Sequence, residues 1–314
     1  MLIGGLELKN NLCLAPLAGI TTLPVREFFS DLGAALTHTE MISCAGLNHD
    51  NAKTFDMLKT SEFEAPLVVQ LFANDEKILL SGAECVLREC KRFSAFGINM
   101  ACPMPKITKN GSGSALLKKT ETAFNMVKSL KTLNLPVWVK IRKLENDFDT
   151  LKFVETVLNA GADNVCIHGR TQAQRYEGFA DKNIVGECTK NFPGFISASG
   201  DVKTLNDIQE YLLMGCVSVM LARGALFNPF LFSSTPLERG DSLQWKYQKL
   251  INFAKRAEIL LGEHKAVVLL KKFVPGILRN THGSAEKRNL ACSAVKLNDI
   301  IEILKGEFIN NYEI

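Results

Sequence analysis

The stretch "NMACPMPKITKNGSG", residues 99–113, places a cysteine just past the end of an apolar run. Two prolines and two glycines follow Cys102, so we expect the thiol on a loop that is exposed and able to move. No histidine is adjacent in the sequence. Two roles therefore stay open for Cys102, an activated thiolate and a neutral thiol that donates a proton.

Two further ionisable groups stand at the ends of apolar runs, Lys140 in "WVKIR" and His168 in "IHGRTQAQ". In a strand, Lys140 and Arg142 point to the same side, and a lysine inside a barrel needs an anionic or carbonyl partner. Three kinds of partner stay open: a cofactor ring, a carbonyl substrate that forms a Schiff base with the lysine, and a carboxylate, either that of Glu40 or that of Asp201. A neutral His168 would donate to a ring nitrogen or carbonyl, or bond only to backbone.

The segments "SASGDV" and "LARGAL" indicate a phosphate site. Gly200 permits close approach of the backbone, and Arg223 with the amide of Gly224 stands at an expected helix start, which attracts anions. Each glycine alone also suits a tight turn, so the pairing of the two segments carries the prediction. Gln70 offers a donor and an acceptor to a heterocycle, or only satisfies a neighbouring strand end.

These groups terminate short apolar or β-branched runs that predict eight strands. The runs are 11–16, 35–40, 66–72, 96–101, 136–142, 163–170, 194–201 and 217–224. Helical patterns between them lie at 75–92, 114–133, 147–160, 180–191 and 204–214, with Ser114 and Thr204 as expected N-caps and an irregular segment at 41–65. Eight strand–helix units predict an α/β fold, a (β/α)₈ TIM barrel with its site at the carboxyl ends of the strands. An open doubly wound sheet is the alternative, and the polar strand ends favour the barrel.

Beyond "TPLERGDS", a linker at 235–242, the patterns are helical only: 243–261, 263–279, 284–293 and 295–309. We predict a catalytic barrel at 1–235 and a small helical domain at 241–314. Residues 1–240 hold 25 Lys+Arg and 25 Asp+Glu, whereas 241–314 hold 12 and 8, so the net charge of +4 lies in the helical domain. This distribution suggests a polyanionic partner, although a solvated helical surface is the simpler interpretation.

Composition excludes several classes of protein. No apolar run reaches the roughly 18 residues of a membrane span, and the start lacks the features of a secretory signal, so we expect a cytoplasmic protein without a membrane partner. The nine cysteines are scattered, with no Cys-x-x-Cys pair, which argues against a disulfide framework and against a metal site. We expect a monomer.

Taken together, these motifs resemble the flavin-dependent tRNA-dihydrouridine synthase family, specifically its bacterial branch. The resemblance covers residues 11–232 through "LAPLAGITTLPVREFFSDLGA", "VVQLFA", "INMACPMPKITKNGSGSALL", "VKIR", "IHGRTQAQ", "SASGDV" and "MLARGALFNPFLF". It implies an FMN-binding barrel that uses NADPH to reduce the C5–C6 double bond of specific uridines in the tRNA D-loop. It further implies that flavin N5 delivers hydride to C6 and that Cys102 protonates C5.

The resemblance also implies roles for individual residues. Cofactor-binding positions are Pro16, Leu17, Ala18, Gln70, Lys140, His168, Ser199, Gly200, Asp201, Ala222 and Arg223. Expected substrate contacts are Asn99 under the uracil, Arg142, Arg170, Thr171 and Gln174, with Arg175, Lys106 and Lys109 as further candidates for the tRNA phosphates.

The chain departs from the family pattern at a few positions. Ser199 stands where asparagine is usual, and Ala73, Ala101 and Ala222 stand where glycine is usual, each adding a methyl group that bears on flavin affinity. Two alternatives remain: an FMN-barrel dehydrogenase of a small pyrimidine, of the dihydroorotate type, and a non-catalytic tRNA-binding scaffold. The basic helical domain argues against the first, since a free base does not need it.

Overall fold

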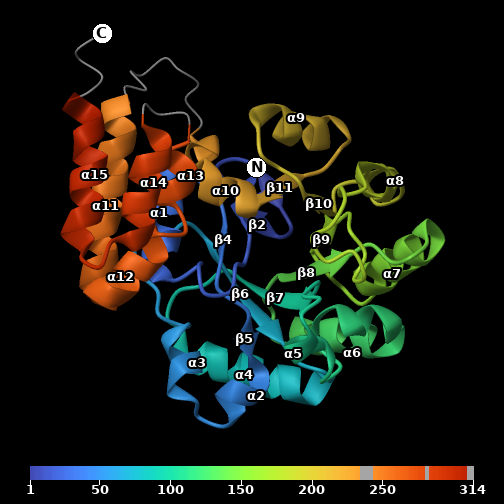
Figure 1. Ribbon diagram of the computed structural model, residues 1–314. Helices are drawn as coiled ribbons and strands as arrows, with labels where there is room; N and C mark the ends of the chain where they lie inside the picture. The colour runs from blue at the N-terminus through green and yellow to red at the C-terminus, as the bar shows by residue number, and fades with distance from the viewer. Residues whose placement is uncertain (234–242, 280–282, 310–314) are drawn as a thin grey trace.

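A closed parallel barrel forms the body of the molecule in the computed structural model, which describes residues 1–233, 243–279 and 283–309 (Figure 1). Its strands are β3 (Leu12–Leu14), β4 (Thr37–His38), β6 (Leu67–Phe72), β7 (Ala95–Met100), β8 (Val137–Arg142), β9 (Asn164–His168), β10 (Ile196–Ser199) and β11 (Ser218–Leu221). β3 pairs with β11, and the ring closes because the Leu14 amide donates to the Leu36 carbonyl at 2.8 Å. The eight predicted strands and the barrel are confirmed.

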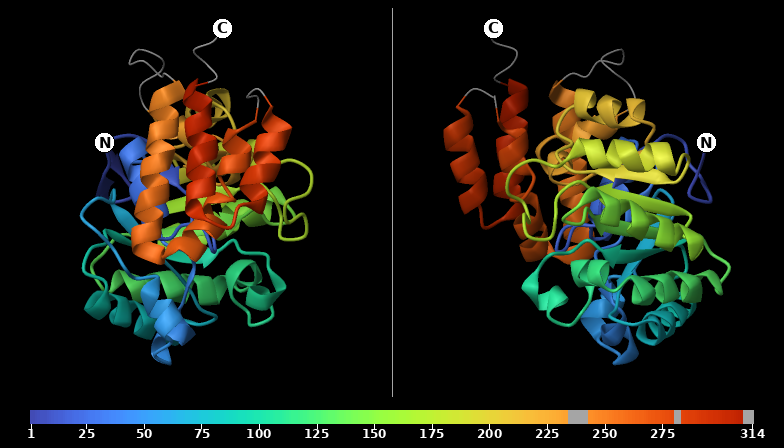
Figure 2. Two further views of the ribbon diagram at one scale, coloured as in Figure 1. Left: turned by 60° about the vertical axis from the view of Figure 1, so that its left-hand side comes forward. Right: turned by 90° about the vertical axis from the view of Figure 1, so that its right-hand side faces the viewer.

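Helices cover the outside of the barrel and bury their apolar faces against the strands (Figures 1 and 2). They are α1 (Leu23–Leu32), α4 (Glu76–Glu89), α6 (Thr120–Lys131), α7 (Asp147–Asn159), α8 (Lys182–Asn191), α9 (Leu205–Leu213) and α10 (Arg223–Phe227). Thr204 caps α9, as predicted, in a reciprocal capping box with Asp207. The prediction for Ser114 was wrong: this serine lies inside a 3₁₀ helix, Gly113–Lys118, and its hydroxyl donates to the Cys102 carbonyl at 3.0 Å.

The amino end of the barrel is closed by a hairpin that the sequence patterns did not indicate, formed by β1 (Leu2–Ile3) and β2 (Leu6–Glu7). The indole N–H of Trp138 donates to the Gly4 carbonyl at 3.0 Å, and Gly4 has a φ of 53°. A Cβ at Gly4 would lie 2.7 Å from the indole ring, so glycine is required for this contact. With this end closed, the carboxyl end is left for a site.

The remaining elements fill the irregular segments and build the helical domain. Residues 41–65 form β5 (Ile42–Ser43), α2 (Cys44–Asn48) and α3 (Ala52–Asp56), and α5 (Pro105–Thr108) follows Cys102. The helical domain contains α11 (Leu243–Leu261), α12 (Glu263–Leu270), α13 (Val274–Ile277), α14 (Ser284–Ser293) and α15 (Leu297–Ile309). The single helix predicted for 263–279 is two helices, since Pro275 lacks the N–H that a continuous helix needs there.

The helical domain packs beside α1 (Figure 2). The rings of Phe28 and Phe253 stack with centroids 4.5 Å apart, and Arg256 forms an ion pair with Glu27 at 2.7 Å. The linker predicted at 235–242 lies outside the described residues, so the domain division stays a prediction. Within the described part of the chain, no helix has both the length and the apolar character required to cross a bilayer.

Candidate functional site

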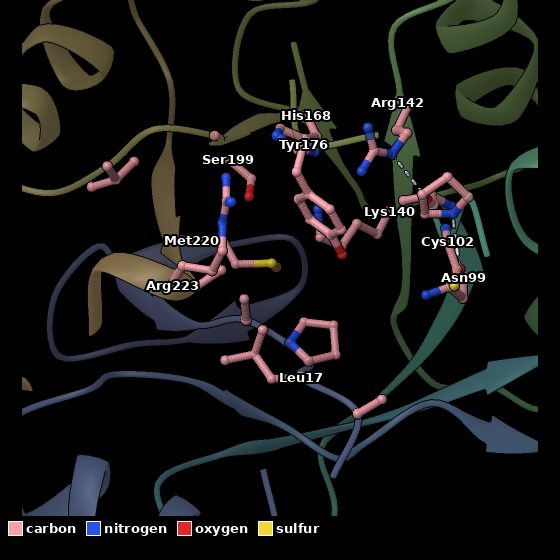
Figure 3. A pocket seen from close by; sticks show the side chains of 18 of the residues that line it. Leu17, Asn99, Cys102, Lys140, Arg142, His168, Tyr176, Ser199, Met220 and Arg223 are labelled. Atoms are coloured by element: carbon pink, nitrogen blue, oxygen red, sulfur yellow. Dashed lines mark hydrogen bonds between the residues drawn. The ribbon is translucent and has the colours of Figure 1, made fainter. Parts of the chain in front are cut away.

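A cavity of about 220 Å³ opens at the carboxyl ends of the barrel strands (Figure 3). The strand ends and the loops that follow them supply its walls, as expected for a barrel. Thirteen of the residues expected to act in catalysis, cofactor binding or substrate binding line it: Pro16, Leu17, Ala18, Asn99, Cys102, Lys140, Arg142, His168, Ser199, Gly200, Asp201, Ala222 and Arg223. Residues from distant parts of the chain are thus brought to one surface.

Lys140 reaches from β8 into this cavity without a partner. No described residue forms a hydrogen bond or ion pair with its amino group, and burial lowers its pKa below the ordinary 10.5. The two carboxylates considered from the sequence are engaged elsewhere, Glu40 with the Gly19 amide and Asp201 with Arg170. An anionic or carbonyl ligand at Lys140 would favour the charged form of the amine that burial disfavours, so the site suits such a ligand.

His168 ends β9 on the same wall and is held in the neutral form. Burial, together with the nearby cations Lys140 and Arg142, lowers its pKa to about 2. Its ring packs against Gly200, where a Cβ would lie 2.6 Å from the imidazole. A neutral imidazole in this position has a nitrogen available for a hydrogen bond to a bound heterocycle.

Gly200, Arg223 and Gly224, the residues predicted to bind a phosphate, lie together in the lining of the cavity. A Cβ at Gly224 would lie 1.9 Å from the Val202 carbonyl, so only glycine permits the close approach of the two loops after β10 and β11. Arg223 is half exposed, and its guanidinium is 3.9 Å from Asp201, too far for a direct hydrogen bond. This donor set fits a phosphate group such as that of FMN.

The alanines that replace expected glycines are accommodated in different ways. Ala101 and Ala222 line the cavity, whereas Ala73 lies in the hydrophobic core. Ala222 precedes α10 with a negative φ of −117°, and the Ala101 carbonyl accepts from Arg142 at 2.8 Å. None of the three alanines has a positive φ, the conformation that most strongly favours glycine.

Cys102 lines the cavity but is only 9% exposed, so the expectation of an exposed thiol was wrong, and the mobility of its loop stays a prediction. Its amide donates to Asn99 Oδ1 at 3.0 Å, and its carbonyl accepts from both the amide and the hydroxyl of Ser114. These bonds hold the loop against the barrel. Burial raises the pKa of the thiol above the ordinary 9.0, with smaller opposing effects from the Met104 backbone and Arg142. The structure therefore favours the neutral thiol over the thiolate.

Four of the expected site residues lie behind the cavity wall, outside its lining: Gln70, Arg170, Thr171 and Gln174. Gln70 accepts from the Asn99 amide at 2.8 Å and so orients that side chain. Arg170 donates to both carboxylate oxygens of Asp201 at 2.8 and 2.9 Å, and the Thr171 amide donates to Gln174 Oε1 at 2.8 Å. The hydrogen bonds of Arg170, Thr171 and Gln174 brace the loop after β9.

Arg175, Lys106 and Lys109, the further candidates for phosphate contacts, are exposed. The loop after β9 also carries a residue that the sequence analysis missed. The ring of Tyr176 stands over the cavity between two guanidiniums, with its centroid 4.7 Å from Arg223 and 5.7 Å from Arg142 (Figure 3). An aromatic residue next to an arginine in a rim loop was the pattern that would have identified it.

Comparisons with known proteins agree with this site. The family model "Dihydrouridine synthase (Dus)" matches residues 13–298. A "Probable tRNA-dihydrouridine synthase" of Treponema pallidum is 28% identical over 96% of this chain and 94% of its own length. A protein of the same name from Rhizobium leguminosarum is 32% identical over 72% of this chain and 71% of its own.

Solved structures share the barrel. TcOYE with pHBA aligns with a TM-score of 0.55 at 10% identity, over 73% of this chain and 89% of that one. Morphinone reductase in complex with tetrahydroNAD aligns with a TM-score of 0.52 at 10% identity, over 76% and 97%. At such identity the likeness concerns the fold alone. The family model matches most of the chain, including the residues that line the cavity. This match shows that the chain belongs to the dihydrouridine synthase family.

Proposed function

We propose that this protein is a tRNA-dihydrouridine synthase that uses FMN and NADPH to reduce the C5–C6 double bond of specific uridines in the tRNA D-loop. The observation that carries the proposal is that Cys102 and the unpartnered Lys140 line one cavity, in a chain that the family model matches over residues 13–298. A monomer that works in the cytoplasm, where its RNA substrate is found, is part of the same proposal.

The residues present fit an FMN group. Lys140 and His168 would face the ring, and Arg223 with the amides of Gly200 and Gly224 would hold the phosphate. Asp201 contributes through its backbone, because its carboxylate is already bonded to Arg170. A flavin bound there would supply hydride to the substrate.

The substrate side of the cavity is formed by Asn99 and Cys102. A uridine must leave its stack to reach this depth, since hydride transfer requires near contact, on the order of 3–3.5 Å. Asn99 orients the backbone of the Cys102 loop, and the thiol donates the proton that balances the hydride. Basic side chains at the mouth, Lys203 and Arg223, favour the polyanionic RNA, with an affinity that falls as salt rises, whereas Arg142 is buried in the wall.

Mass spectrometry of tRNA tests the proposal directly. A strain that lacks the gene should lose dihydrouridine at one or more D-loop positions, and a plasmid copy of the gene should restore it. The position that is lost also identifies the target uridine. Unchanged dihydrouridine would favour a small-pyrimidine dehydrogenase or a non-catalytic scaffold, and a purified protein that stays colourless with excess FMN would argue against the cofactor.

The pH dependence of uridine reduction should follow the protonation of the Cys102 thiol. A general acid acts in its protonated form, and burial raises the pKa of Cys102, so its contribution is lost only as pH rises through that raised value. We expect single-turnover reduction of tRNA by the reduced enzyme to stay constant from about pH 7 to about pH 9 and to fall above that range. A rate that rises through this interval would instead indicate a thiolate.

A further inference from the structure

The helical domain contacts the wall of the cavity at one turn of the barrel, Leu17–Thr21, here called the rim turn. Leu17 lines the cavity. The turn is closed at its base, because the Leu17 amide donates to the hydroxyl of the fully buried Thr21 at 3.1 Å. The amides of Ile20 and Thr21 both donate back to the Leu17 carbonyl at 3.0 Å. Gly19 forms the apex with a φ of 68°, a conformation that favours glycine.

The peptide groups at Gly19 are held from two directions. Its amide donates to the carboxylate of Glu40, which follows β4 of the barrel. Its carbonyl accepts from the Lys272 ammonium at 2.5 Å, and Lys272 lies between α12 and α13 of the helical domain. Both bonds involve a charged side chain and lie at the exposed surface of the molecule. The rim turn is therefore clamped between the barrel and the helical domain.

The same segment of the helical domain touches a second wall of the cavity. Helices α10 and α13 lie side by side (Figure 1), and a Cβ at Gly276 of α13 would lie 2.7 Å from the ring of Phe227 in α10. The guanidinium of Arg279 stands over that ring, 4.9 Å from its centroid. Helix α10 begins at Arg223, which lines the cavity. Residues 271–279 thus contact both the rim turn and the helix that carries the expected phosphate ligand.

We propose that Lys272 is a positioning residue for the cavity, which fixes the rim turn and thereby couples the helical domain to cofactor binding. By holding Gly19, Lys272 determines where Leu17 and Ala18 stand in the cavity wall. This inference rests on the proposed function in two respects, namely that the cavity takes FMN and that the helical domain takes tRNA. Because coupling between binding sites is reciprocal, any change in FMN affinity that tRNA causes through Lys272 is matched by an equal change in tRNA affinity that FMN causes.

The test compares Lys272→Met with Lys271→Met in the full chain. Lys271 is the matched control, since it is the adjacent lysine and its ammonium has no partner among the residues described. Hydrogen exchange of the ligand-free protein should be faster in the rim turn of Lys272→Met only, with the rest of the barrel and the melting temperature unchanged. The FMN dissociation constant, measured by flavin fluorescence, should rise about 5-fold in Lys272→Met, at the low end of coupled sites, and Lys272→Arg should restore it.

The outcomes separate this inference from the proposed function. If the wild-type chain binds FMN and the two lysine variants bind it equally well, the positioning role is refuted while the function stands. Unchanged exchange in the rim turn refutes it as well, whatever the flavin does. A tightening of FMN binding by tRNA in the wild type that disappears in Lys272→Met supports it. A wild-type chain that takes up no FMN overturns the proposed cofactor, and with it the cofactor half of this inference.

Discussion

Replacing Cys102 with alanine should leave the flavin bound and reducible by NADPH, yet slow uridine reduction by about 10²-fold or more, as the loss of a general acid does. The thiol lines the same cavity as Lys140, and burial keeps it protonated by raising its pKa. The backbone bonds that hold its loop come from Asn99 and Ser114 and do not involve the sulfur. The wall should therefore survive the substitution, and the loss should fall on proton donation.

Rapid mixing of pre-reduced enzyme with unmodified tRNA transcript measures this step, since flavin oxidation reports the turnover. Cys292→Ala is the matched control, because Cys292 is exposed on α14, in the helical domain. Reduction of the flavin by NADPH should be the same in both variants. Full activity of Cys102→Ala would remove the thiol from the mechanism.

Replacing Lys140 with methionine should slow reduction of the flavin by NADPH by about 10²-fold, the typical loss when one donor to a developing negative charge is removed. Lys140 is partly buried and unpartnered among the described residues, so a bound ring is its only ligand in the proposed complex. Methionine keeps the length and apolar character of the side chain, which separates the effect of charge from that of packing. Stopped-flow measurement of flavin bleaching checks the rate.

Lys203→Met serves as the control for this second prediction, because Lys203 lines the same cavity but is exposed at its mouth. Its loss should weaken RNA binding in a salt-dependent way and leave flavin reduction intact. If Lys140→Met binds FMN with wild-type affinity and is reduced at the wild-type rate, the lysine does not act on the ring. Our assignment of the cofactor's orientation would then be wrong.

The strands of the barrel and the face on which each side chain lies could be predicted from the sequence. Strand position follows from short apolar runs, and the two-residue period places Lys140 and Arg142 on one side of β8, where both line the cavity. Helix α9 could also be predicted, because its capping box is a local pattern. Local sequence rules fail where a side chain binds a partner that is distant in the sequence but near in space. Ser114, for example, donates its hydroxyl to the Cys102 carbonyl and does not cap a helix.

The sequence by itself determined the closed barrel, its rim and most of the residues that line the cavity. These features could be predicted because hydrophobic periodicity and the residue preferences of turns act over a few residues. Only the tertiary structure determined which side chains are available to bind a ligand. Arg170 and Asp201, 31 positions apart, pair with each other, while Lys140 has no partner among the residues that the structure describes. Burial made Cys102 a neutral thiol, and packing of the helical domain brought Lys272 to Gly19 across 253 positions. Ion pairing, desolvation and domain contacts depend on which residues are close in space. Short sequence patterns do not contain that information.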